Sequence, residues 1–233
     1  MAVAVITGAS RGLGLALARA LAERGWKLVV DARGAPALEA ARRDLAAATE
    51  VVAVAGDVAD EGHRRALVDA AELLGGLDLL VNNASLLGPS PQPALARYPL
   101  DVLAGVYQVN VVAPLGLVQL ALPLLRSSGG RILNVTSDAA VEGYEGWGGY
   151  GSSKAALEQL SNVLAAEEPG VRVWWLDPGD MRTRMHQEAF PGEDISDRPP
   201  PEDSVPAVIR LLDEDRPSGR YRARDLLAVG VGA

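Results

Sequence analysis

Short apolar runs alternate along the chain with longer stretches in which apolar residues recur every three or four positions. The runs predict strands at Val3–Ile6, Lys27–Asp31, Val51–Ala55, Leu77–Val81, Arg131–Thr136 and Val171–Leu176, and an edge strand at Tyr221–Val229. The longer stretches predict helices over Leu15–Arg24, Ala35–Ala48, Asp60–Leu74, Leu100–Arg126, Tyr150–Glu167 and Asp203–Asp213. Strands that are apolar throughout are buried on both faces, so the pattern predicts an α/β fold with a doubly wound, mostly parallel seven-stranded sheet and helices on both faces.

Two of the predicted helices, Leu100–Arg126 and Tyr150–Glu167, are apolar on more than one face. A helix that is apolar all round is buried, either in a core or against another subunit. Within the first of them, Pro114 has no N–H to donate to the carbonyl of Asn110. We therefore expect a kink in this helix at Asn110.

The length of 233 residues fits a single domain over residues 1–233. One long loop-like stretch, Gln187–Ser204, contains Pro191-Gly192 and Pro199-Pro200-Pro201. It reads either as a surface connection or as a mobile lid beside a ligand. We favour a substrate lid over residues 184–204.

Composition excludes several classes of protein. The net charge of −8 argues against a general affinity for nucleic acid. Cysteine is absent and only His63 and His186 are present, so a thiolate or histidine metal site is not expected. We see neither a secretory signal nor a stretch of about 18 apolar residues suited to a membrane, and so expect a cytoplasmic protein without a membrane partner.

A glycine-rich segment, Thr7-Gly8-Ala9-Ser10-Arg11-Gly12-Leu13-Gly14, joins the first strand to the first helix. Glycines let a backbone turn tightly and approach a ligand, and a helix N-terminus offers free N–H groups to a pyrophosphate. A tight turn alone would also explain three glycines. Their position and their G-x-x-x-G-x-G spacing resemble the Rossmann-type nucleotide loop of the short-chain dehydrogenase/reductase family.

Five further segments resemble that family in the same order along the chain. They are Asp57-Val58, Asn82-Asn83-Ala84, Asn110, Ser137 with Tyr150-x-x-x-Lys154, and Pro178-Gly179 with Thr183. Each lies at the carboxyl end of a predicted strand or on the expected helix, where ligands bind in open α/β sheets. The resemblance implies an NAD(P)-dependent oxidoreductase.

Tyr150 and Lys154 lie four positions apart at the start of a helix and so share one face. Lys154 is one of only two lysines. A nearby ammonium is expected to lower the pKa of a phenol, which then exchanges a proton with a carbonyl oxygen. Ser137 can hydrogen-bond the same oxygen. The alternatives without a catalytic role are that Tyr150 packs in the core and that Lys154 is a solvent-exposed helix residue.

The resemblance assigns further roles to individual residues. It implies catalytic roles for Asn110, Ser137, Tyr150 and Lys154, with Lys154 also binding the nicotinamide ribose and the Asn110 carbonyl holding a water; a simple kink is the alternative for Asn110. It implies cofactor contacts from Gly8, Ser10, Arg11, Gly12, Leu13, Gly14, Arg33, Asp57, Val58, Asn83, Ala84, Tyr150, Lys154, Pro178, Gly179 and Thr183.

The end of the second strand bears on the choice of cofactor. Asp31 could grip ribose hydroxyls and favour NAD, but the resemblance places the NAD-selecting acid at Ala32. Arg33 and Arg11 fall where NADP-preferring members carry basic residues, and arginine pairs well with a 2′-phosphate. We expect NADP, with NAD as the alternative.

Substrate recognition is less defined. Ser85 stands where the family usually has glycine after Asn-Asn-Ala, and a side chain there could narrow the site or tilt the nicotinamide. Residues that flank the catalytic positions or lie in the lid are Leu86, Leu87, Glu142, Tyr144, Trp147, Met185 and Phe190. Their character suggests a partly apolar substrate, and Asp138 would disfavour anionic ones.

These observations predict an NADP(H)-dependent oxidoreductase that interconverts a carbonyl and a secondary alcohol. The resemblance also implies that the two apolar helices pair across subunits, in a homodimer or homotetramer. A catalytically silent dinucleotide sensor or scaffold of the same fold is the alternative. A sugar-nucleotide epimerase or dehydratase ranks last, because such relatives are usually longer.

Overall fold

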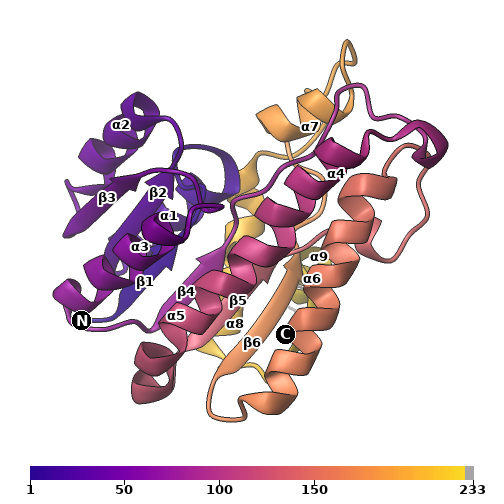
Figure 1. Ribbon diagram of the computed structural model, residues 1–233. Coiled ribbons are helices and arrows are strands. Elements are labelled where there is room, and N and C mark those ends of the chain that lie inside the picture. The colour runs from indigo at the N-terminus through magenta and orange to yellow at the C-terminus, as the bar shows by residue number, and fades with distance from the viewer. Residues whose placement is uncertain (229–233) are drawn as a thin grey trace.

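The computed structural model describes residues 1–228, and these form one sheet covered by helices on both faces (Figure 1). All strand pairs are parallel, in the order β3-β2-β1-β4-β5-β6-β7. The strands are β1 Val3–Ile6, β2 Lys27–Ala32, β3 Val51–Ala55, β4 Leu79–Asn82, β5 Arg131–Val135, β6 Arg172–Asp177 and β7 Gly219–Arg222. The predicted doubly wound parallel sheet is confirmed.

The helices divide between the two faces of the sheet. They are α1 Gly12–Glu23, α2 Ala35–Leu45, α3 Glu61–Leu74, α4 Leu100–Tyr107, α5 Ala113–Ser128, α6 Gly148–Glu167, α7 Arg184–Ala189, α8 Val205–Asp213 and α9 Ala223–Ala228. One core is built on α1, α2, α8 and α9, and the other on α3, α5 and α6.

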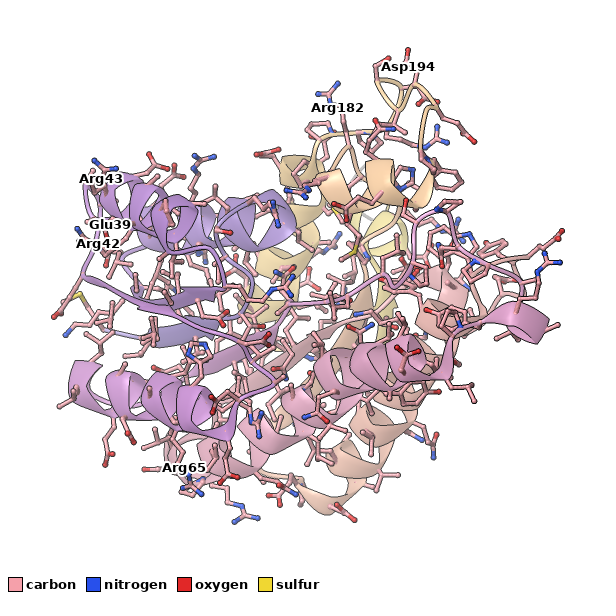
Figure 2. All side chains as sticks on the ribbon, turned by 45° about the horizontal axis from the view of Figure 1, so that its top comes forward. Glu39, Arg42, Arg43, Arg65, Arg182 and Asp194 are labelled. Atoms are coloured by element: carbon pink, nitrogen blue, oxygen red, sulfur yellow. The ribbon has the colours of Figure 1, made fainter. Side chains whose placement is uncertain are left out.

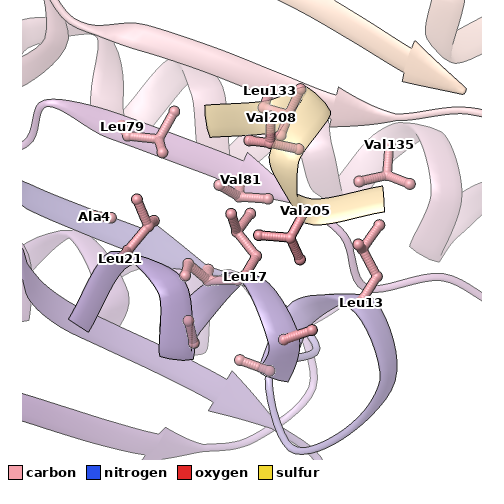
Figure 3. Packing of buried hydrophobic residues seen from close by; sticks show 14 of the residues in the cluster. Ala4, Leu13, Leu17, Leu21, Leu79, Val81, Leu133, Val135, Val205 and Val208 are labelled. Carbon is pink, nitrogen blue, oxygen red and sulfur yellow. The ribbon is translucent and has the colours of Figure 1, made fainter. Parts of the chain in front are cut away.

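The first core shows how sequence period becomes packing. Leu13, Leu17 and Leu21 repeat every four residues on α1 and are all buried. Figure 3 shows Leu17 beside Val81 of β4 and Val205 of α8, and Leu21 beside Ala4 of β1. Burying such a side chain contributes about 1.5–3 kcal/mol, and the first core therefore fixes α1 and the loop before it against the sheet.

The order of the strands creates the place where a ligand can bind. The chain leaves β1 toward β2 and β3 on one side, then returns to β4 on the other. The loops that follow β1 and β4 therefore diverge at the carboxyl edge of the sheet. Such a switch point leaves a crevice outside the strand ends.

The predicted edge strand Tyr221–Val229 is wrong over most of its length. β7 ends at Arg222, and α9 occupies Ala223–Ala228, while residue 229 lies outside the described residues. Ala223 and Leu226 are buried three positions apart. A spacing of three positions is typical of a helix, and this segment is helical although its apolar composition favoured a strand.

The long apolar stretch of residues 100–128 is continuous but not regular. Between α4 and α5 the helix widens into a π-helical turn at Gln108–Val112, closed by a hydrogen bond from the N–H of Ala113 to the carbonyl of Gln108. The irregularity expected from Pro114 is therefore present, in the form of a wider turn. Asn110 lies in its middle.

The expectation that no stretch suits a membrane was wrong by length and composition. The helical stretch Leu100–Ser128 has 29 residues and contains an 18-residue window with a mean hydropathy of 1.6, enough by length and composition to cross one. In this fold, however, Leu117, Val118 and Leu125 are buried in the core shared with α3 and the sheet. The same composition therefore serves a core helix here.

Candidate active site

The glycine loop after β1 is held by backbone and side-chain hydrogen bonds from neighbouring strands. Thr7 Oγ1 accepts from the N–H groups of Asn83 and Ala84 at 2.9 and 3.0 Å. Asn83 Nδ2 donates to the carbonyls of Thr7 and Gly8 at 2.8 and 3.2 Å. The ends of β1 and β4 are thus tied together directly below the loop.

Two of the loop glycines are required by geometry. Gly8 has φ of +67°, which side-chain-bearing residues rarely adopt. At Gly14, a Cβ would lie 2.5 Å from Asn83 Nδ2 and 2.6 Å from the carbonyl oxygen of Gly8. Gly14 therefore permits α1 to pack against the loop. Gly14 itself does not line the cleft above the loop, unlike the other residues predicted in this segment.

Asp31 is buried under the glycine loop, with only 1% of its surface exposed. Oδ1 accepts from the Gly8 N–H at 2.7 Å, and Oδ2 lies 2.9 Å from Nε2 of His63 on α3. Both carboxylate oxygens thus have protein partners. The contact with His63 had no local signal in the sequence, because the two residues are 32 positions apart and only the fold brings α3 beneath β2.

A cleft of about 1000 Å³ runs over the carboxyl edge of the sheet. It is lined by these predicted residues: Gly8, Ser10, Arg11, Gly12, Leu13, Arg33, Asp57, Val58, Asn83, Ala84, Ser137, Tyr150, Lys154, Pro178, Gly179 and Thr183. The cleft takes in both the glycine loop and the region around Tyr150. It therefore has room for a dinucleotide and a small substrate. The donors and glycines present fit such a group.

Of the predicted substrate residues, all except Glu142 line the cleft. Leu86, Leu87, Tyr144, Trp147, Met185 and Phe190 do so, whereas Glu142 is exposed outside it. The ring of Trp147 lies edge-on to Tyr150 at 5.8 Å and 5.9 Å from the ring of Phe190. An aromatic wall thus joins the catalytic candidates to the lid segment, defined as residues 184–204.

The lid segment rises from the sheet after β6. Figure 2 shows Arg182 just before it and Asp194 at its tip, far from the Glu39 and Arg42 pair on α2. Its helix α7 is capped by Thr183, whose Oγ1 accepts from the N–H of His186 at 3.3 Å. His186 also lines the cleft, and sequence reasoning missed it because a lone histidine carries no spacing signal.

Tyr150 and Lys154 are both buried in the first half of α6 and both line the cleft. Lys154 Nζ donates to the carbonyl of Val135 at 2.8 Å and lies 5.5 Å from the centre of the Tyr150 ring. Ser137, two residues after β5, lines the same cleft, and its hydroxyl donates to Asp138 Oδ1 at 2.9 Å. The fold therefore brings the three predicted catalytic side chains together.

The expected fall in the pKa of Tyr150 is not found. Burial raises this pKa above its ordinary value, and the charges of Asp138 and Asp177 raise it further. Burial also lowers the pKa of Lys154 to about 8. Desolvation of both groups outweighs their mutual attraction, because the ammonium lies over the ring and bonds a carbonyl.

Asn110 reaches the site from the π-helical turn but does not line the cleft. Its Oδ1 accepts from the N–H of Leu86 at 2.8 Å and from Ser85 Oγ at 3.0 Å. Its Nδ2 donates to the Leu86 carbonyl and to Ser153 Oγ, both at 2.9 Å. Its side chain therefore joins the loop after β4 to the helix that carries Tyr150.

Ser137 is held from behind by the edge strand. Arg220 of β7 donates to the Ser137 carbonyl at 3.3 Å and pairs with Glu158 at 2.9 Å. Glu158 also accepts from Thr136 Oγ1 at 2.8 Å. Arg220 and Glu158 were not foreseen, since neither lies near a motif and their contact spans 62 positions.

Comparison with known proteins agrees with this geometry. The sequence model of the short chain dehydrogenase family matches residues 2–194. The chain is 38% identical over 193 residues to the rhamnolipids biosynthesis 3-oxoacyl-[acyl-carrier-protein] reductase of Pseudomonas aeruginosa, covering 78% of this chain and 74% of that protein. It is 37% identical over 202 residues to mouse sepiapterin reductase, covering 81% and 77%.

A solved structure shows the same likeness in space. The alcohol dehydrogenase of Thermococcus sibiricus, solved with 5-hydroxy-NADP, superposes with a TM-score of 0.86 at 31% identity over 95% of each chain. The fold and site define an NAD(P)-dependent oxidoreductase. The chain belongs to the short-chain dehydrogenase family.

Proposed function

We propose that this protein is an NADP(H)-dependent oxidoreductase that interconverts a carbonyl and a secondary alcohol, with Tyr150 as the general acid/base. One observation carries the proposal: Ser137, Tyr150 and Lys154 line the same cleft as the glycine loop. A reacting carbon placed between them would be within reach of both the phenol and a dinucleotide. The dinucleotide, when bound, would donate or accept the hydride.

The assignment of NADP rests on the acidic and basic residues at the end of β2. Asp31 also lines the cleft, but it is 1% exposed and both of its carboxylate oxygens are engaged, by Gly8 and His63, so it is poorly placed to accept from ribose hydroxyls. Arg11 and Arg33 line the cleft and would pair with a 2′-phosphate. The Thermococcus sibiricus relative carries an NADP derivative, which supports the same choice.

The protonation state of Tyr150 suits it to act as the acid in carbonyl reduction at neutral pH. Because burial raises its pKa, the phenol keeps its proton and can donate it to a carbonyl oxygen as hydride reaches the carbon. Ser137 would orient that oxygen, and Lys154 would bind the nicotinamide ribose. In the reverse reaction the phenolate takes the proton back.

The aromatic wall supports a substrate that is at least partly apolar. The rings of Trp147 and Phe190 lie 5.9 Å apart and both line the cleft, and Phe190 belongs to the lid segment. We propose that residues 184–204 close over the substrate, within a single domain. We also propose that the exposed apolar residues of α4, the π-helical turn and α6 join copies of the chain into a homodimer or homotetramer.

The test measures NADPH and NADH consumption with a panel of ketones, aldehydes and quinones. We expect turnover with a lower KM for NADPH than for NADH. Tyr150→Phe should lower kcat by about a thousandfold or more, since general acid catalysis contributes roughly 10²–10⁴-fold, while the Kd for NADPH stays nearly unchanged. Tyr107→Phe, outside the cleft, is the matched control.

Two outcomes would contradict these assignments. Unchanged kcat in Tyr150→Phe would remove the tyrosine from the chemistry, and cofactor binding without turnover on any substrate would favour a sensor. A tenfold preference for NADH over NADPH would make NAD the cofactor instead of NADP.

A further inference from the structure

Asp31 is an acidic side chain at the end of β2 that the proposed binding of NADP leaves without a task. It lines the cleft together with Arg11 and Arg33, yet it is buried. A free carboxylate at this place would accept hydrogen bonds from the adenosine ribose, as is typical of NAD binding. It would also repel the 2′-phosphate that distinguishes NADP from NAD. Binding of NADP therefore needs Asp31 to be held back from the ribose.

His63 on α3 makes the contact that holds Asp31 back. Its Nε2 lies 2.9 Å from Asp31 Oδ2, while Asp31 Oδ1 accepts from the Gly8 N–H at 2.7 Å. Because an ionised carboxylate can only accept, the hydrogen of the first bond lies on His63 Nε2. The His63 side chain is 7% exposed and does not line the cleft, so it reaches the carboxylate from the side of α3.

Gly56, the first residue after β3, makes room for the His63 ring. A Cβ at position 56 would lie 2.3 Å from His63 Nδ1 and 2.8 Å from its Cγ. The backbone at Gly56 does not adopt a left-handed conformation, so its conformation does not require glycine. The absence of a side chain at Gly56 therefore serves the contact between His63 and Asp31.

We propose that His63 is a positioning residue that sets the choice of cofactor: by donating to Asp31 Oδ2, it holds this carboxylate away from the adenosine ribose. The pair leaves that end of the cleft to Arg11 and Arg33, which bind the 2′-phosphate of NADP. His63 itself touches neither the cofactor nor the substrate. This inference rests on the proposed function, because it takes NADP as the cofactor and explains how the chain selects it.

Two effects of losing His63 act in the same direction. Asp31 Oδ2 would lose its donor and become free to accept from the 2′-hydroxyl of NAD, which strengthens binding of NADH. The carboxylate would also lose a hydrogen bond that compensates its charge, and a buried charge without that partner repels the 2′-phosphate more strongly. The glycine loop stays anchored, because the Ala9 N–H donates to the backbone carbonyl of Asp31 at 2.9 Å whatever the side chain does.

The test titrates the wild type, His63→Leu and His63→Gln with NADPH and NADH, and with adenosine 2′,5′-bisphosphate and AMP as the adenosine halves. The first variant removes the donor, and we expect it to lower the ratio of the Kd for NADH to the Kd for NADPH by about ten- to a hundredfold, the size of one hydrogen bond to a charged group. The ratio for the adenosine halves should fall equally. The second variant keeps a donor nitrogen at a similar reach and should retain most of the wild-type ratio.

Further variants locate the effect. Val68→Ala is the matched control: it perturbs the packing of the same helix outside the cleft, has no polar group to offer Asp31, and should leave both ratios unchanged. His63→Leu combined with Asp31→Asn should lose most of the gain in NADH affinity, because the carboxylate charge is gone. His63→Asn replaces His63→Leu if the latter does not fold, since its amide nitrogen reaches no further than His63 Nδ1 and also leaves Oδ2 without a donor.

The proposal fails if His63→Leu and His63→Asn keep the wild-type ratios, if His63→Gln shifts them as far as His63→Leu does, or if Asp31→Asn leaves the gain in NADH affinity intact. Equal weakening of NADPH and NADH also overturns it and makes His63 a purely structural residue. None of these titrations needs turnover, so they are independent of the test on Tyr150. A wild type that binds NADH and AMP more tightly than NADPH and the bisphosphate overturns the cofactor of the proposed function instead.

Discussion

Lys154 shows how a residue can serve a site at the expense of stability. The ammonium is 2% exposed, and burial lowers its pKa to about 8, below the ordinary value of 10.5. The unfolded chain therefore holds this proton more tightly than the folded one. Stability is reduced below pH 8, where both states are protonated, and recovers as pH rises from about 8 to 10.5.

We therefore expect Lys154→Met to be inactive but more stable at pH 7. The gain in the free energy of unfolding should be on the order of 1 kcal/mol, because the lost hydrogen bond to Val135 offsets part of the relieved desolvation. Denaturant unfolding at pH 7, 8 and 9.5 measures it. The difference between variant and wild type should shrink as pH rises, and a constant difference would contradict the argument.

For single residues, the sequence predicted which side chains lie together in the site, but not the direction of their pKa shifts or all of their hydrogen-bond partners. The Tyr150 and Lys154 spacing placed both on one helix face, as observed. The direction of the pKa of Tyr150 depended on burial and on Asp177, 27 positions away, which no local pattern encodes. The two partners of Asp31 likewise depend on how α3 packs beneath β2.

Among the elements, the π-helical turn has the clearest consequence for the site. Pro114 cannot donate a hydrogen bond to the Asn110 carbonyl, and the helix widens there. The turn sets the direction in which the Asn110 side chain reaches Leu86 and Ser153. A regular α-helix would rotate that side chain relative to both.

We expect Pro114→Ala to lower kcat by roughly ten- to a hundredfold, because it restores an N–H that favours regular α-helix and so displaces Asn110. The Kd for NADPH should stay close to that of the wild type. Steady-state kinetics and a cofactor titration check this. Pro123→Ala, in the interior of α5 and outside the cleft, is the matched control, and equal losses in the two variants would show a general helix effect.

The boundaries of helices and strands were predicted well where an apolar run or a capping residue marks them. Val51–Ala55 was predicted to the residue, and Asp60 caps α3 as expected, accepting from the Gly62 N–H. The failure at α9 has a physical cause. Tyr221 of β7 pairs with Leu176 of β6. The residues after β7 pack against α8 instead of pairing with a strand, so tertiary packing made this segment helical.

For the whole molecule, the exposed apolar residues of the helices around the π-helical turn are the feature that bears on assembly. Leu100, Val112 and Val163 are 77%, 48% and 41% exposed in the single chain. Contiguous exposed apolar side chains mark subunit contacts, and these three residues are candidates for such a contact. They agree with the expectation of a homodimer or homotetramer, which stays a prediction.

Light scattering should give a mass of about two or four times the 24.3 kDa of the chain. A double variant, Val112→Glu with Val163→Glu, should shift the population toward monomer, because buried unpaired charge is costly. Leu73→Glu is the control, since Leu73 is 88% exposed on α3, another part of the surface. A strictly monomeric wild type would contradict the prediction.

All seven strands run in the same direction, and this has a practical consequence for handling the enzyme. Met1 is 92% exposed, and the Val3 N–H is anchored by Asp78 Oδ2 at 2.8 Å at the amino edge of the sheet. The cleft opens at the opposite edge. A bead, an electrode or a fusion partner coupled ahead of Met1 would therefore leave the entrance facing the solution.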